Sequence, residues 1–165
     1  MMEIAKQQYS DLCHAYELLE DATDSQTFRV LWVASLSLCR SIGYVLDRDE
    51  DETVRKTSRE LFKEWRNDSD CIFNVFIDYE RNMIIHEGKV GCSLAPHFVT
   101  MISDGAMTRY DLSEDLVYVP FSADLHDRYG DIDVRDLLRD AISWWGVQLR
   151  RIETKLLNES ESNLS

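Results

Sequence analysis

Residues 79–88 read YERNMIIHEG and place an arginine, an asparagine and a histidine within six positions. The guanidinium of Arg81 offers paired N–H donors that match a phosphate, and a lysine would not reproduce that geometry. The imidazole of His86 belongs to the side-chain type that takes or gives a proton most readily near neutral pH. These residue types suit proton transfer and charge stabilisation at a phosphate.

A purely structural interpretation of the same residues stays open. His86 follows Tyr79 and Met83 along an apolar stripe, and Arg81 could pair with Asp78 one turn earlier. On a straight α-helix, residues five apart are rotated by about 140°, so Arg81 and His86 do not lie side by side. Arg81 would have to reach round, the helix end would have to loosen, or a two-fold partner would have to supply the complementary group.

The spacing of apolar residues predicts the helices that would position this segment. Helices are expected over about 3–20, from the capping-box sequence at 23–26 to about 46, and over about 52–66. A fourth helix, about 70–87, carries the segment and stops at Gly88. A last long helix starts between Asp131 and Asp136. The expected fold is mainly α, an antiparallel bundle of four to five helices.

The segment from about 89 to 130 differs from the rest of the chain. It is rich in Val, Thr, Phe and Tyr, with Gly and Pro between them, and Asp104-Gly105 has the composition of a hairpin turn. Two or three short strands are expected over 97–121, as a small β-hairpin or meander inserted before the last helix. The length suits one domain over 1–157, followed by a polar flexible tail at 158–165.

The helix expected over 52–66 carries basic residues at steps of four, four and three. One interpretation is a track that binds the phosphates of RNA, and the other is a solvated face offset by glutamates of the same helix. The basic residues are Arg55, Arg59, Lys63 and Arg66. The glutamates are Glu52, Glu60 and Glu64.

The charge of the whole chain limits which partners it can bind. A net charge of -13 argues against a protein that coats itself in nucleic acid, because general phosphate affinity needs surplus Lys and Arg. Any RNA contact has to be local, which screening over about 8 Å at physiological salt allows. The apolar stretch 31–38 is too short to span a membrane, and the first residues lack a secretory layout, so a cytoplasmic protein without membrane contact is expected.

No metal or cofactor site is expected from the sequence. The acidic link 47–52 lacks the Gly of a calcium loop and starts a helix instead. The cysteines are widely spaced, without a Cys-x-x-Cys pair, and are expected to be core residues. They are Cys13, Cys39, Cys71 and Cys92.

The motif Arg-Asn-x-x-x-His at 81–86 resembles that of the HEPN domain family. In that family an Arg and a polar residue precede a His that lies four to six positions after the Arg, late in a core helix. The similarity covers the motif helix and, more loosely, the helical frame, while the strand-like segment resembles an insertion. In some family toxins a Tyr two positions after the His is modified by a partner enzyme, and here Gly88 stands at that position.

The resemblance implies a homodimer that joins two motifs in a composite Arg/His cleft and acts as a metal-independent endoribonuclease. Such enzymes leave a 2′,3′-cyclic phosphate and a 5′-hydroxyl. His86 would take the 2′-hydroxyl proton or protonate the leaving 5′-oxygen, Arg81 would hold the phosphate, and Asn82 would orient the phosphate or His86. A toxin or defence effector with a regulatory protein partner fits this expectation. The alternative is a non-catalytic HEPN module that binds a nucleotide or a partner protein.

Overall fold

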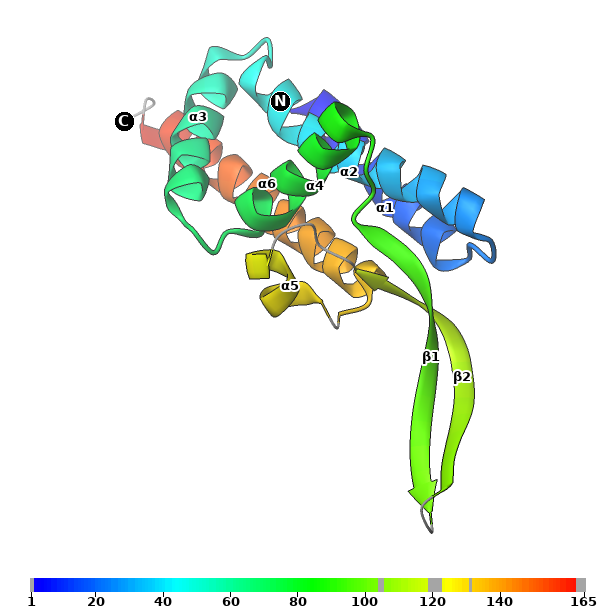
Figure 1. The fold of residues 1–165 in the computed structure, drawn as a ribbon. Helices are drawn as coiled ribbons and strands as arrows, with labels where there is room; N and C mark the ends of the chain where they lie inside the picture. The colour runs from blue at the N-terminus through cyan, green and yellow to red at the C-terminus, as the bar shows by residue number, and fades with distance from the viewer. Residues whose placement is uncertain (1, 104–105, 119–122, 131, 163–165) are drawn as a thin grey trace.

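A computed structural model describes residues 2–103, 106–118, 123–130 and 132–162, with side chains over 2–92, 126–130 and 132–159. The described chain is mainly helical, with one pair of strands (Figure 1). The elements in order are α1 (Glu3–Glu20), α2 (Ser25–Asp47), α3 (Glu52–Asn67), η1 (Phe73–Asp78), α4 (Tyr79–Asn82), η2 (Met83–Glu87), β1 (Cys92–Ser103), β2 (Ala106–Tyr118), α5 (Ala123–Tyr129) and α6 (Val134–Ser162).

The bundle is built around α2, which packs against α1, α3 and α6. Its buried face includes Trp32, Leu36 and Ile42 at helical spacing, so burial of one apolar stripe accounts for its position. Trp65 of α3 meets Trp145 of α6 edge-on, with ring centroids 5.6 Å apart. These large aromatic contacts hold α3 and α6 together beneath the motif helix.

Helix α2 is also long and apolar enough to cross a membrane, judged by length and composition alone. Its mean hydropathy over the relevant window is 1.3, and 33% of that window is buried inside the bundle. A core helix meets the same criteria, so this is weak evidence for a membrane span.

The motif lies on one continuous helical segment, but this segment is not the plain α-helix expected over about 70–87. It is widened into π turns over Phe73–Asp78 and again over Met83–Glu87, with α4 between them. Gly88 ends the segment with a left-handed φ of 66°, and its N–H donates to the Ile84 carbonyl at 3.1 Å. π turns of this kind are frequent at functional sites.

Strands β1 and β2 pair antiparallel and project away from the helices (Figure 1). The sequence predicted two or three short strands over 97–121, whereas the structure has two strands of 12 and 13 residues. Pro96 lies inside β1 beside a register shift between His97 and Phe98, a place where a two-stranded sheet tolerates proline. The expected turn at 104–105 lies outside the described residues, and helix α5 was not expected.

The tail expected over 158–165 overlaps the end of the last helix. Helix α6 runs to Ser162, so the backbone over 158–162 is helical, and residues 163–165 lie outside the described part of the chain. Leu156 is buried close to this end. Extending a helix that is already packed needs no new nucleation, and the polar composition of the segment does not oppose it.

The start of α2 gives a testable pH dependence. The Asp24 carboxylate accepts hydrogen bonds from the backbone N–H groups of Thr27 (2.9 Å) and Gln26 (3.0 Å), and the Thr27 bond is the main cause that lowers the pKa of Asp24. Because the pKa of Asp24 is lower in the folded state, the stabilisation is complete above the unfolded pKa of about 3.9. It is lost as the pH falls through the folded pKa.

We expect Asp24→Ala to lower the melting temperature at pH 7, and this difference to shrink below about pH 4. Asp21→Ala, a nearby exposed control, should show no such trend. A difference for Asp24→Ala that is constant with pH would contradict this account.

Candidate functional site

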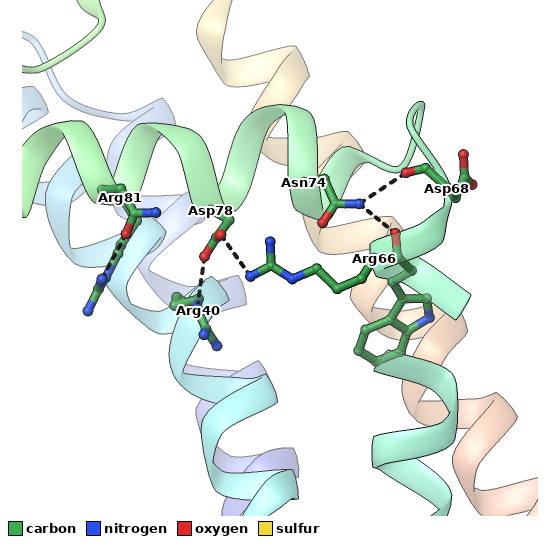
Figure 2. A network of polar contacts seen from close by, with 8 residues as sticks. Arg40, Arg66, Asp68, Asn74, Asp78 and Arg81 are labelled. Carbon is green, nitrogen blue, oxygen red and sulfur yellow. Dashed lines mark hydrogen bonds and ion pairs between the residues drawn. The ribbon is translucent and has the colours of Figure 1, made fainter. Parts of the chain in front are cut away.

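Asp78 on the motif helix joins three elements of the bundle (Figure 2). Its carboxylate accepts from Arg40 Nε of α2 at 3.1 Å and from Arg66 Nη2 of α3 at 3.0 Å. The Asp78 side chain is only 14% exposed, so this is a largely buried carboxylate between two guanidinium groups. Asp78 is therefore occupied by two arginines, neither of which is the Arg81 that the sequence suggested.

Arg81 lies one turn further along and is free of acidic partners in the described part of the chain. Its Nη1 donates to Asn82 Oδ1 at 2.9 Å, which is a neutral acceptor. Arg81 also lines a groove of about 470 Å³ against α2, together with Arg40, Ser41 and Tyr44. The structure thus brings Arg81 and Asn82 together, and adds an arginine that sequence reasoning missed.

One feature of the sequence could have identified Arg40. It is the only charged residue between Val30 and Val45, in an otherwise apolar or neutral helix. Arg40, Arg66, Arg81 and Asp78 form a cluster of three guanidinium groups and one carboxylate. This cluster has an excess of two positive charges. An anion can therefore be attracted here although the whole chain is strongly acidic.

His86 lies on η2 and is exposed, so it is not a core residue in the described structure. In a π turn the hydrogen bonds join residues five apart. Residues with this spacing therefore lie closer to one face of the helix than they do in a regular α-helix. Even so, His86 does not line the groove that contains Arg81, whereas its neighbour Ile85 does. One chain alone does not place the imidazole at the arginine groove.

Of the four basic residues of the expected track on α3, Arg55, Arg59 and Lys63 line one open hollow, and Arg66 does not. Arg55 donates to the backbone carbonyls of Asp49 and Glu50, and Arg59 Nε donates to Asp47 Oδ1 at 2.6 Å. Arg66 binds Asp78, so Lys63 alone of the four is exposed with no partner in the described residues.

The acidic partners also differ from those expected. Of the three glutamates named as the offset, Glu52 and Glu60 line the same hollow, whereas Glu64 pairs with Arg151 of α6 at 2.9 Å. The partners of the α3 arginines are aspartates and carbonyls of neighbouring elements, because the end of α2 and the motif helix face this side of α3.

Comparison of the chain with protein-family models, with curated proteins and with solved structures finds no match. The resemblance to HEPN domains therefore depends on the motif residues of the sequence alone. Among the described residues, no group of three or more His, Cys, Asp or Glu side chains is placed to hold a metal ion.

Glu80, the residue before Arg81, connects the motif helix to the start of the hairpin. Its side chain is 0% exposed, and its Oε2 accepts from the Gly91 N–H at 3.2 Å. Burial, and next the negative charge of Glu80, raise the pKa of the neighbouring Cys92 thiol to about 12. The neutral thiol is therefore the form present at neutral pH, and nucleophilic chemistry by this cysteine is disfavoured.

Gly91 leaves the space that the Glu80 carboxyl occupies. A Cβ at position 91 would lie 2.7 Å from Glu80 Cδ, so Gly91→Ala has to displace a buried carboxyl group and its hydrogen bond. We expect Gly91→Ala to lower the free energy of unfolding by about 1–3 kcal/mol, measured by urea denaturation. In a Glu80→Ala background the same change should cost clearly less, because the clash is gone. Equal costs in both backgrounds would show that Glu80 is not the cause.

Proposed function

We propose that this chain is a HEPN-type domain that acts as a homodimer and cleaves RNA without a metal ion, through attack of a 2′-hydroxyl on the adjacent phosphate. One observation carries the proposal. Arg81 reaches a groove with no acidic partner among the described residues, while His86 is exposed on the last turn of the same helical segment. Both side chains are thus accessible to a ligand, as the reaction requires.

The reaction assigns a distinct role to each group. The guanidinium of Arg81 binds the scissile phosphate and stabilises the charge that develops on its oxygens. His86 accepts the 2′-hydroxyl proton as the 2′-oxygen bonds to phosphorus, and the resulting imidazolium returns a proton to the 5′-oxygen as its bond to phosphorus breaks. The products are a 2′,3′-cyclic phosphate and a 5′-hydroxyl. Asn82, bonded to Arg81 at 2.9 Å, orients the guanidinium.

The dimer is part of the proposal because His86 does not line the groove of Arg81 in one chain. A two-fold partner would bring its own His86 to the first chain's Arg81, and the symmetric contact would form the second site. The proposal also includes the location and role that the resemblance implies: a cytoplasmic toxin or defence effector that a regulatory protein inhibits.

A non-catalytic module that binds nucleotides or a partner protein is the second candidate. The separation of His86 from the arginine groove favours it, since an anion clamp needs only the arginines. The net charge of -13 also disfavours affinity for long RNA.

Incubation with mixed RNA in EDTA separates the two candidates. Native protein should release fragments with 2′,3′-cyclic phosphate and 5′-hydroxyl ends, while His86→Ala and Arg81→Ala should be inactive. Two exposed residues away from the groove provide matched controls: His14→Ala and Arg29→Ala should keep native activity. Nuclease contamination would give cleavage by all five proteins, which contradicts the enzyme proposal. No cleavage by any of them, with phosphate binding lost only in Arg81→Ala, would establish the binding module.

A further inference from the structure

A second cavity, between α2 and α3, adjoins the groove of Arg81. It has a volume of about 230 Å³, and Arg40 and Tyr44 line both spaces. The cavity extends from these two residues toward α3, so the two spaces meet at one pair of side chains. Its other main lining residues are Gly43, Asp47, Phe62 and Trp65.

The cavity wall combines aromatic rings with one hydrogen-bonding pair. Phe62 and Trp65 supply apolar surface, and the backbone at Gly43 forms another part of the wall. At the exposed rim, Asp47 Oδ1 accepts from Arg59 Nε at 2.6 Å, which neutralises both charges yet leaves a carboxylate oxygen and guanidinium N–H groups for other partners. A flat ring with hydrogen-bonding edges matches this combination of surfaces.

Tyr44 marks the boundary between the two spaces. Tyr44 is 51% exposed, and the Arg48 guanidinium lies 4.4 Å from the ring centroid. A tyrosine ring held in this way offers a stacking surface for a planar ligand at low cost in conformational entropy. On the far side of this boundary, Arg40 and Arg81 belong to the cluster with two excess positive charges.

We infer that the two spaces together bind a nucleoside phosphate, with its base in the cavity between α2 and α3 and its phosphate at Arg40 and Arg81. The inference is based on the position of an aromatic cavity next to an arginine groove, since Arg40 and Tyr44 line both. It rests on the proposed function in one respect, the binding of a phosphate by Arg81. Both free nucleotides and single-stranded RNA supply this chemistry.

Calorimetric titration of the full chain with AMP, GMP, CMP, UMP and ribose 5-phosphate tests the inference. At least one nucleotide should bind about tenfold more tightly than ribose 5-phosphate, because base stacking adds to the phosphate contact. Tyr44→Leu should abolish this preference and Tyr44→Phe, which keeps the ring, should retain it. Arg40→Gln should weaken nucleotide and ribose 5-phosphate alike, whereas Arg29→Gln, on the same helix, should change neither.

Equal affinity of the native protein for nucleotides and ribose 5-phosphate would overturn the inference, as would no binding at about 10 mM ligand. An undiminished preference in Tyr44→Leu would also overturn the assignment of the base site. Melting temperatures check that each variant is folded, and the Tyr44 pair decides the question even if Arg40→Gln is unstable. A parallel titration with a hexamer of RNA shows whether a free nucleotide or a strand binds better. Nucleotide binding without RNA cleavage would leave this inference intact and remove the endoribonuclease proposal.

Discussion

An equal mixture of His86→Ala and Arg81→Ala proteins should recover about one quarter of native RNA cleavage, although each variant alone is nearly inactive. Loss of the imidazole alone should reduce the rate by about 10²–10⁴, the usual contribution of a general acid or base. Recovery follows if each site takes Arg81 from one chain and His86 from the other. In a mixed dimer, one site then loses both groups and the other keeps both.

The expected quarter comes from random exchange, in which about half of the dimers are mixed and each of these has one intact site of two. The structure motivates this test, since Arg81 lines a groove that His86 does not reach in the described chain. The measurement is initial cleavage rate after the two variants are mixed and equilibrated, compared with each variant kept apart. Activity that stays at the level of the separate variants would exclude a site shared in this way, and a strict monomer in solution would exclude it as well.

Asp78→Asn should lower stability while it tightens anion binding. The largely buried carboxylate accepts from both Arg40 and Arg66, so its neutralisation leaves two guanidinium groups close together without a counter-charge. We expect the free energy of unfolding to fall by about 2 kcal/mol. The local excess of positive charge rises by one, and affinity for inorganic phosphate should increase by about threefold.

Stability should fall while phosphate affinity rises, and this combination makes the prediction specific to the arginine cluster. Urea denaturation measures the first effect and phosphate titration the second. Asp70→Asn is the matched control: it removes one negative charge from an exposed pair with Arg128, where Asp70 is 77% exposed. That change should alter neither quantity appreciably. Weaker phosphate binding in Asp78→Asn would mean that Asp78 mainly positions Arg40, and would contradict the charge argument.

The sequence alone was enough to predict most of the helical frame. The expected helices at 3–20 and 52–66 agree closely with α1 and α3, because apolar residues at steps of three and four are local signals, as is the capping residue Asp51 of α3. For α2 the predicted start was correct within a residue or two, with Asp24 as the capping residue. The motif itself was also visible in the sequence, since Arg81, Asn82 and His86 are neighbours along the chain.

The packing of the helices determines which partners these side chains have. Arg40, Arg66 and Asp78 are far apart in sequence and meet because α2, α3 and the motif helix pack together (Figure 2). The π turns on either side of α4, and the length of the paired strands around Pro96, likewise depend on contacts or pairing that no local pattern contains. Spacing along the chain determined which residues share a helix face. The packing of helix on helix then decided that Asp78 binds two other arginines and leaves Arg81 facing an open groove.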